Sequence, residues 1–500
     1  MLHASGLESQ GTITNSRFTR NRSVVKRHWG KNWVGGEQNW EDNEEKDAAT
    51  GNLSALSQRF REVGLWVGRG DTTKVFVEMG WYHRKNDSLQ NGAVRRVNTS
   101  NRFFLKTRLL QTAKSNLLLF ANYRRLTYND AARPDEPSLN SRLVYNDRYW
   151  GQLVQVTTAV ETASGTLPQQ EFTYLEVNAG QGVYMWNDYN GNGIQELQEF
   201  EVAPFPDLAK YVRVFLPNQI FVKTHQNKFS QSLILNPAAW INAKGFKKVL
   251  SHFYNQTAFT IDQKTQRVGE RFHLNPFNPG SENLLGLNES FRNSLFFNRG
   301  RQLHSMTYTY LVTKVRTLLS VGSQENQLRS HQLQYAHLWR KTWLFNFESS
   351  WSSSTGISDN FAARNFELEA TQWLPKVSYL FSANTSVSLF YEQKSKKNIL
   401  TDGEQLHQQR FGASINYIGS KQFTLTGEYS YYQNDFSGNT NSPVAFQMLE
   451  GLQPGRNGTW RILLQKNLTK YLDLNLNYLG RQSENTKTIH TGSVQLRAFF

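Results

Sequence analysis

The 500 residues are rich in aromatic and small polar types; only 38% are apolar, and the mean hydropathy is −0.60. No apolar run approaches the roughly 18 residues of a transmembrane helix, which excludes a helical membrane span. Cysteine is absent, so disulfides, thiolate metal sites and cysteine nucleophiles are excluded as well. The net charge is +16, but the basic residues are spread among strands and loops and form no nucleic-acid-binding module, so we predict no nucleic-acid partner. We interpret the excess positive charge as that of a basic lumen or of rims that meet lipopolysaccharide phosphates.

Residues 1–56 show no clear hydrophobic period and are predicted to be an irregular N-terminal segment. A basic stretch, 17–31, precedes an acidic one, 37–47, and we interpret the two as a solvated loop with one hairpin rather than a binding patch. The opening residues have neither the basic nor the apolar region of a signal peptide. If the chain is an outer-membrane protein, we therefore expect it to be truncated at its N-terminus.

Residues 57–179 are predicted to form a first block of β-strands. Val75, Val77 and Met79 alternate with polar or small neighbours, which is the period of a strand with one apolar face. The further strands expected in this block are 103–109, 117–124, 141–149, 152–163 and 169–179.

Residues 180–225 break this rhythm and are predicted to be an inserted module with a calcium loop. Residues 188–199 match the calcium-loop template D-x-[DN]-x-[DN]-G-x5-E without a mismatch. Oxygen ligands at these spacings converge on one centre, and a glycine at the sixth position permits the sharp turn. The predicted ligands are Asp188, Asn190, Asn192, the carbonyl oxygen of Ile194, and Glu199.

Two departures argue against a full EF-hand: Gln195 stands where an apolar residue is expected, and no amphipathic helix precedes the loop. We therefore expect an isolated loop that holds a structural Ca²⁺ ion. The alternative is that Asn-Gly-Asn-Gly is a simple turn, because these residues tolerate positive φ.

Residues 226–500 are predicted to be the C-terminal strands of the same sheet. In the last segments Leu472, Leu474 and Leu476 share one face while Asp473 and Asn475 share the other. Counting back from Phe500, short connections (467–470, 419–421, 382–384, 340–341, 299–301) alternate with mostly longer ones (481–487, 434–457, 397–408, 353–363, 263–288). Short turns on one rim and long loops on the other are typical of outer-membrane barrels.

Aromatic residues fall near both predicted rims of this block. Two interfacial girdles are expected in a membrane barrel. The outer girdle would contain Trp460, Phe411, Tyr429 and Tyr431, and the inner one Tyr417, Phe423 and Phe500. A soluble sheet with one solvated face would show the same alternation, but it has no reason to keep the unequal loops.

Catalytic signatures such as G-x-S-x-G, H-E-x-x-H and a P-loop are missing, so we predict a protein that is not an enzyme. Two alternatives stay open. One is a soluble extracellular calcium-dependent binder of glycans or other ligands, in which Trp343, Trp351 and Trp373 are stacking platforms. The other is an outer-membrane hydrolase that uses a histidine on the barrel wall.

Three stretches, 182–197, 217–229 and 489–500, resemble large uncharacterised outer-membrane proteins of Bacteroidetes-type bacteria. The resemblance covers residues from about 140 onward and implies that this chain is the C-terminal part of such a protein. It implies a location in the outer membrane of a Gram-negative bacterium, where a terminal aromatic, Phe500, resembles the signal read by the barrel-assembly machinery.

The expected fold is thus all-β: an antiparallel transmembrane barrel of roughly 16–20 strands with a small calcium-loop insertion. The expected function is non-enzymatic, in transport or secretion or as a component of an envelope complex. Expected partners are outer-membrane lipid, lipopolysaccharide and envelope proteins.

Overall fold

The computed structural model describes residues 1–267, 269, 271–277, 283–301, 303–319, 322–400, 403–419, 423–484 and 486–499, without the side chains of 168–170, 217–220 and 319. The chain divides into two compact units. Unit 1 contains Met1–Leu167, Val222–Leu233 and Thr260–Leu285, and unit 2 contains Pro168–Phe221, Ile234–Phe259 and Gly286–Phe500. Phe500, proposed from the sequence as an assembly signal and girdle residue, lies outside the described residues.

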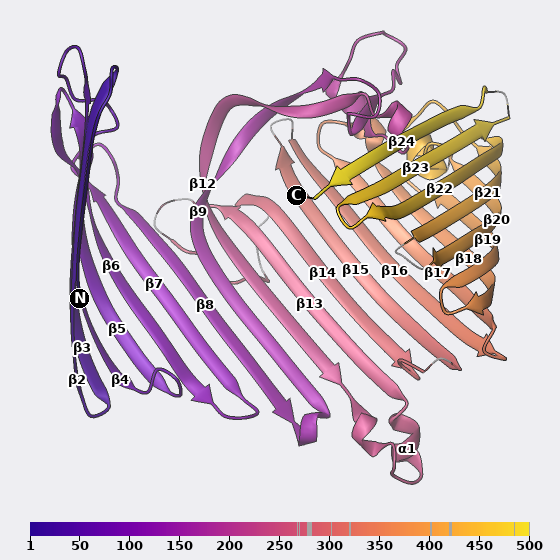
Figure 1. The fold of residues 1–500 in the computed structure, drawn as a ribbon, viewed down its shortest axis with the longest axis horizontal. Helices are drawn as coiled ribbons and strands as arrows, with labels where there is room; N and C mark the ends of the chain where they lie inside the picture. Colours follow the sequence, from indigo (N-terminus) through magenta and orange to yellow (C-terminus); the bar gives the residue numbers. More distant parts are fainter. Residues whose placement is uncertain are drawn as a thin grey trace. The chain divides into compact units, whose positions relative to one another are not determined.

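Unit 1 is an antiparallel sheet in which strands lie side by side in chain order (Figure 1). Its strands are β1 (Leu2–Gln10), β2 (Thr14–Trp29), β3 (Asn32–Asp47), β4 (Gln58–Gly70), β5 (Phe76–Gln90), β6 (Ala93–Gln111), β7 (Asn116–Tyr128) and β8 (Glu136–Tyr149). Strands β9 (Val154–Glu176), β12 (Tyr211–Leu235) and β13 (Phe253–Gln266) contribute residues to both units. A two-residue turn with positive φ at Asn91 and Gly92 joins β5 to β6, as in a tight hairpin.

The irregular segment predicted for residues 1–56 is instead regular: it contains β1, β2 and β3. The basic strand β2 pairs with the acidic strand β3, so that Arg20 faces Glu41 and Arg17 faces Glu44. Arg22 Nε donates to Glu37 Oε1 at 2.6 Å. Complementary charge, rather than an apolar period, favours this hairpin, and a search for hydrophobic alternation misses it.

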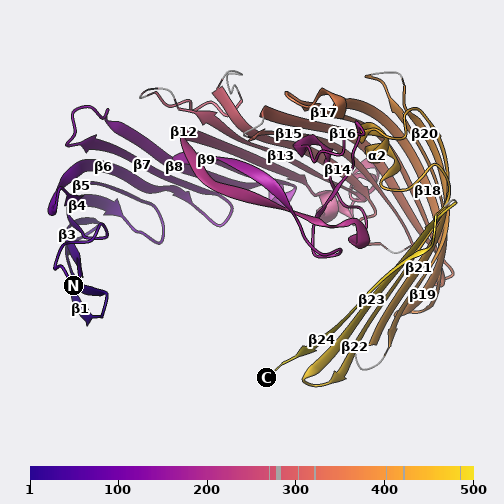
Figure 2. The same ribbon diagram turned by 90° about the horizontal axis from the view of Figure 1, so that it is seen from above.

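Unit 2 also consists of antiparallel strands, built from consecutive hairpins. Its strands are β14 (Leu284–Phe297), whose first two residues belong to unit 1, β15 (His304–Leu319), β16 (Gly322–Trp339), β17 (Trp343–Ser358), β18 (Phe366–Ser382), β19 (Thr385–Asn398), β20 (Gln405–Gly419), β21 (Phe423–Ser437), β22 (Gly455–Thr469), β23 (Leu472–Ser483) and β24 (Ile489–Ala498). Figure 2 shows β18–β23 as one continuously curved wall. The predicted all-β antiparallel fold is confirmed.

The described residues hold 22 long strands and the short strands β10 (Tyr184–Trp186) and β11 (Phe200–Val202), a few more than the 16–20 expected. Besides β1–β3, the difference lies around the insertion. The strand expected at 169–179 is the end of β9, and residues 211–225, assigned to the inserted module, already belong to β12.

The unequal loop lengths predicted for the second half are present. Short connections follow β16, β18, β20 and β22, and longer ones follow β17, β19 and β21. The connection between β15 and β16 departs from this alternation, because residues 323–327 are the start of β16 and pair with β15. Arg340 and Lys341, both at positive φ, make the turn after β16.

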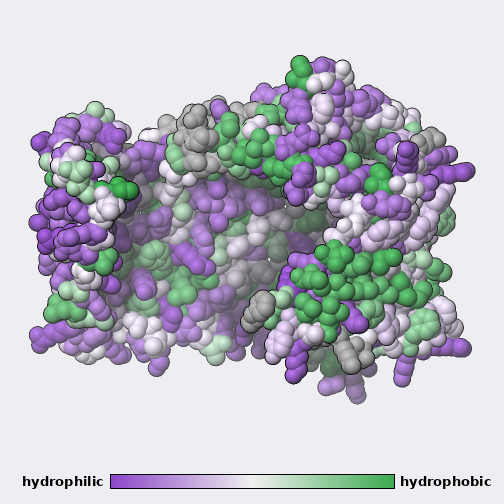
Figure 3. All heavy atoms as spheres, turned by 45° about the horizontal axis from the view of Figure 1, so that its top comes forward, coloured by the Kyte–Doolittle hydropathy of each residue, from purple (hydrophilic) through white to green (hydrophobic). Residues whose placement is uncertain are grey.

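Each unit has a row of apolar side chains along one face. In unit 1 a register row runs Leu65, Trp81, Phe103, Tyr123 and Leu139. In unit 2 a row runs through six strands: Phe345, Val377, Leu389, Ala413, Tyr429 and Trp460. Several of these side chains are exposed; Leu389 has 63% of its surface accessible. Figure 3 shows a broad hydrophobic patch where β22–β24 lie.

The opposite face of unit 2 is polar. Arg410 joins Glu392 (3.1 Å) and Glu428 (2.7 Å), and Ser378 and Ser388 share a hydrogen bond. The helix α2 (Pro443–Leu449) packs on this face through a small apolar cluster. The cluster contains Leu368, Leu406, Val444, Met448 and Leu449.

The remaining helices are short. They are α1 (Phe246–Leu250) and the 3-10 turns η1 (Trp150–Gln152), η2 (Leu197–Glu199), η3 (Pro206–Leu208), η4 (Pro237–Trp240) and η6 (Ala362–Arg364). Within the described part of the chain, no helix has the length and apolar character needed to cross a membrane.

Candidate functional site

The inserted module lies between β9 and β12 and is held together by aromatic packing. Its short strands pair Tyr184 with Val202 and Trp186 with Phe200. The ring of Phe200 stacks on that of Tyr174 with centroids 4.0 Å apart and meets Tyr211 edge-on at 5.1 Å. Because these rings come from both strands and from the module, they fix the base of the insertion.

The predicted calcium loop begins with an ordered carboxylate. Asp188 Oδ1 accepts hydrogen bonds from the backbone of Gly191 (2.7 Å) and Asn192 (3.1 Å), and its Oδ2 accepts one from Gly193 (2.8 Å). Gly191 and Gly193 have φ near +70°, which a side chain would strain. Asn190 Oδ1 accepts from the Asn192 backbone N–H at 3.0 Å. The loop is thus folded tightly around its first residue.

The loop ends on a buried carboxylate. Glu199 is 1% exposed, and it accepts from Trp186 Nε1 at 2.8 Å and from the Tyr189 backbone at 3.2 Å. In contrast, the Ile194 side chain points to solvent, while its backbone N–H donates to Asn192 Oδ1. All five predicted ligands therefore lie in one compact loop.

Among the described residues, no three His, Cys, Asp or Glu side chains come together as a metal site. The calcium motif would rely on two carboxylates, from Asp188 and Glu199, and on amide and carbonyl oxygens. Calcium binding at this loop stays a prediction.

Arg364, from the loop between β17 and β18, anchors the module. Its Nη1 donates to the carbonyl oxygens of Gln198 (2.8 Å) and Phe200 (3.2 Å), and its Nη2 to Glu201 Oε2 (2.7 Å). The Glu201 side chain is 10% exposed. This one guanidinium therefore binds the end of the predicted calcium loop and the strand that follows it.

A second set of contacts joins the module to the C-terminal strands. Arg481 on β23 donates to Asp207 and lies over the ring of Phe205, 4.4 Å from its centroid. Asn441 donates to the Tyr189 carbonyl at 3.4 Å. The module is thus fastened at several points to the polar face of unit 2.

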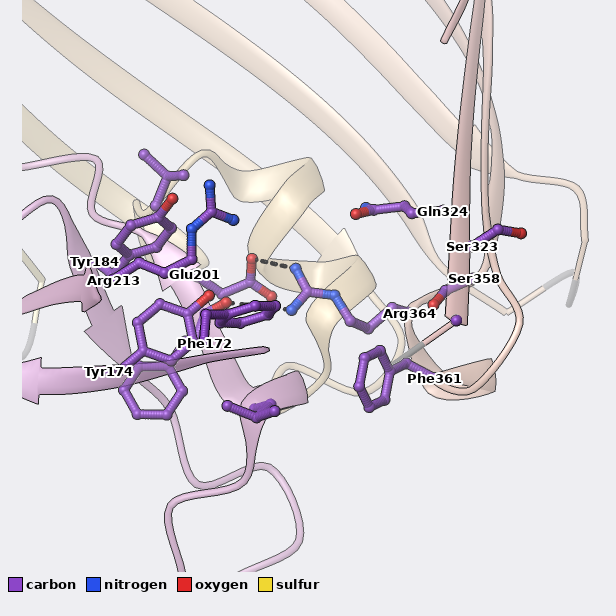
Figure 4. A pocket seen from close by; sticks show the side chains of 14 residues that line it. Phe172, Tyr174, Tyr184, Glu201, Arg213, Ser323, Gln324, Ser358, Phe361 and Arg364 are labelled. Atoms are coloured by element: carbon purple, nitrogen blue, oxygen red, sulfur yellow. Dashed lines mark hydrogen bonds and ion pairs between the residues drawn. The ribbon is translucent and has the colours of Figure 1, made fainter. Parts of the chain in front are cut away.

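A cavity of about 250 Å³ lies between the module and β16, β17 and the loop that follows β17. Figure 4 shows Arg213 and Tyr184 on one side, Gln324 and Ser358 on the other, and the Glu201–Arg364 ion pair between them. The full lining is Phe172, Tyr174, Tyr184, Leu197, Phe200, Glu201, Val202, Arg213, Gly322, Ser323, Gln324, Ser358, Phe361 and Arg364.

The electrostatics of the cavity follow from burial. Desolvation raises the pKa of Glu201 above its ordinary value, and Arg364 opposes the shift. Outside the cavity lining, burial and the neighbouring Glu201 carboxylate also raise the pKa of Tyr189. Since Arg213 and Arg364 face a single carboxylate, the lining carries one net positive charge.

Sequence reasoning located the module but not this cavity. Its lining comes from two segments, 172–213 and 322–364, that no spacing rule connects. One local signal was available: Tyr211, Arg213 and Phe215 alternate on one strand face, which places a cation between two aromatic rings.

The tryptophans considered as glycan platforms lie on exposed strand positions of unit 2. Trp343 contacts Tyr379 edge-on at 4.9 Å, and Trp351 lies 5.4 Å from the ring of His331. Trp373 is 59% exposed. The predicted girdle residues do gather: Phe411 pairs with Tyr431, Tyr429 pairs with Trp460, and Tyr417 meets Phe423 at 5.8 Å.

No protein-family model and no curated protein matches this chain. Among solved structures, the FrpB iron transporter from Neisseria meningitidis (F5-1 variant) aligns with 99% of this chain and 80% of its own, at 9% identity and a TM-score of 0.39. The ferric-catecholate import receptor Fiu from E. coli K12 in its open form aligns with 95% of this chain and 76% of its own length, at 10% identity and a TM-score of 0.34. The siderophore receptor PirA from Acinetobacter baumannii aligns with 96% of this chain and 75% of its own length, at 8% identity and a TM-score of 0.35. These values are too low to assign a family or a function.

Proposed function

We propose that this chain forms the wall of an outer-membrane β-barrel in a Gram-negative bacterium and acts, without catalysis, in transport or secretion or within an envelope complex. The proposal builds on the resemblance to outer-membrane proteins of Bacteroidetes-type bacteria. Its proposed partners are lipid acyl chains on the apolar face, lipopolysaccharide at the rim and other envelope proteins.

The exposed apolar rows carry this proposal. Leu389 on β19, Tyr429 on β21 and Ile462 on β22 each have 40% or more of their surface accessible, and they lie on one face of the sheet. Soluble monomers rarely expose contiguous apolar patches larger than a few hundred Å². The face behind them holds the Arg410 ion network, as expected for a polar lumen. In lipid, every backbone polar group must be paired, which favours closure of the wall.

The module supports a role in controlled passage rather than open conduction. Arg364 and Arg481 hold it on the polar face, where it would occupy part of a lumen. A protein that simply filtered small solutes would need no such internal anchors, whereas a gated transporter or a scaffold for a partner would.

Extraction tests the location. Membranes from cells expressing the chain should release it only with detergent, and the purified protein should migrate differently in gels with and without heating. Full solubility without detergent would contradict the barrel and support the calcium-dependent soluble binder, whose tryptophans would then face water.

We also propose that loop 188–199 binds one Ca²⁺ ion that orders the module. The ordered Asp188 carboxylate, the two glycines with positive φ and the buried Glu199 support it. Calorimetric titration of the full chain with Ca²⁺ should give one site that is lost in Asp188→Asn and in Glu199→Gln. A matched control is Asp71→Asn, which alters another turn-forming aspartate in unit 1. Unchanged binding in both loop variants would remove the site.

A further inference from the structure

The cavity between the module and β16, β17 and the loop after β17 contains an arginine without an acidic partner. Within the described part of the chain, Arg213 forms no ion pair, and its guanidinium carbon lies 5.4 Å from the ring centre of Phe172 and 5.8 Å from that of Tyr184. Arg364, in contrast, is fully engaged by Glu201 and two carbonyl oxygens. The free positive charge of the cavity is therefore that of Arg213.

The other groups on the lining are suited to hydroxyls and to flat carbon faces. Gln324 extends from β16 toward the cavity and, among the described residues, makes no side-chain hydrogen bond. Tyr174 and Tyr184 present rings that meet edge to face at 5.0 Å. An amide can bind two neighbouring hydroxyls, and an aromatic ring can pack on the C–H face of a sugar.

We propose that this cavity binds a monosaccharide-sized acidic sugar, with the carboxylate on Arg213, the hydroxyls on Gln324 and the ring against Tyr184. A carboxylate matches the fork of an arginine, which can donate two parallel hydrogen bonds. The volume of about 250 Å³ is near the lower limit of small-molecule pockets, which favours one sugar ring over a longer chain.

Other ligand classes fit the cavity less well. A bare inorganic anion would use Arg213 but would leave the rings and Gln324 without a role. An aromatic acid would use Arg213 and the rings but would leave the Gln324 amide without a role. A neutral sugar would leave the arginine uncompensated. Such a site goes beyond the proposed location of the chain in a membrane and does not depend on it.

Calorimetry on the full chain in detergent tests the proposal with galacturonate as the probe. Three comparison ligands each carry part of this chemistry. Galactose is the neutral sugar, benzoate is the aromatic acid and inorganic phosphate is the bare anion. Galacturonate should bind at least about tenfold more tightly than each of them, because only it engages all three kinds of group.

Two variants locate the site. Arg213→Gln should weaken galacturonate binding about tenfold or more while changing galactose binding little, because it removes only the carboxylate partner. Gln324→Leu should weaken both sugars. Arg213 and Gln324 are exposed side chains, so both variants should fold. Arg456→Gln, which changes an exposed arginine of the same unit outside the cavity lining, is the matched control and should leave binding unchanged.

Three results would overturn the inference. Equal affinity for galacturonate and galactose would remove the role of the cation. Equal affinity for phosphate or benzoate would replace the acidic sugar by a simpler anion. Unaltered galacturonate binding in Arg213→Gln would place any site elsewhere on the chain.

Discussion

Replacing Leu389 by arginine separates a lipid-facing wall from a water-facing one. Leu389 is the fifth residue of β19, and its side chain is 63% exposed. With a rise of about 3.3 Å per residue and a strand tilt of about 40°, it lies roughly 10 Å from the turn before β19, near the middle of an apolar band about 25 Å tall. An arginine at that depth costs about 2–4 kcal/mol. The same change at a water-exposed position costs within about 0.5 kcal/mol.

The measurement is urea-dependent folding of the chain into phosphatidylcholine vesicles, followed by tryptophan fluorescence. The matched control is Phe246→Arg, which places the same charge on an exposed phenylalanine of the short helix α1, between strands. Leu389→Arg should lower the free energy of unfolding by about 2–4 kcal/mol and Phe246→Arg by less than about 0.5. If the two variants shift the transition equally, Leu389 does not face lipid and the reasoning fails.

Three further predictions concern the module and the wall. Burial raises the pKa of Glu201 above its ordinary value of 4.5, so protonation of Glu201 stabilises the docked module fully below pH 4.5, and this stabilisation is lost as the pH rises through the raised pKa. Hydrogen exchange of residues 177–210, corrected for intrinsic rates, should therefore be slower at pH 5 than at pH 8. Glu201→Gln should remove the difference. Arg364→Ala leaves the Glu201 carboxylate without its partner and should weaken docking by about 1–3 kcal/mol, seen as faster exchange of the same residues at pH 8. A Cβ at Gly480 would lie 2.0 Å from the indole of Trp460, so Gly480→Ala should cost about 1–3 kcal/mol in the vesicle folding assay.

Each of these has a clear contrary result. A pH difference that persists in Glu201→Gln would mean that another group titrates. Unchanged exchange in Arg364→Ala would show that the remaining contacts suffice to hold the module. A neutral Gly480→Ala would show that the Trp460 ring moves aside freely, and Gly492→Ala, where the nearest atom is 3.8 Å away, is the control.

The sequence was sufficient to predict the strands with a clear apolar face. Leu472, Leu474 and Leu476 alternate so regularly that a slip of one residue against β24 would move the apolar set to the other face, and the observed register places Leu476 opposite Val494. The loop asymmetry followed from the same periodicity, except at the hairpin after β15, where polar residues 323–327 continue a strand.

Features that depend on partners distant in sequence were not predictable in the same way. The β2–β3 hairpin is stabilised by charges that only pairing reveals. The Arg364 anchor and the Arg213 cavity each combine residues more than a hundred positions apart. A single sequence shows that residues 180–225 differ from their surroundings, but it does not show which strand they contact.

The opposite charges of β2 and β3 make the first hairpin responsive to ionic strength. Arg20 and Glu41 are 3.9 Å apart and partly exposed, so their attraction is weak and readily screened. At 1 M salt the Debye length falls to about 3 Å, and this hairpin should loosen. The apolar row through Leu65, Trp81 and Phe103 depends instead on exclusion from water, which sulfate and similar salts strengthen. Changes in salinity therefore act in opposite directions on neighbouring strands of one sheet.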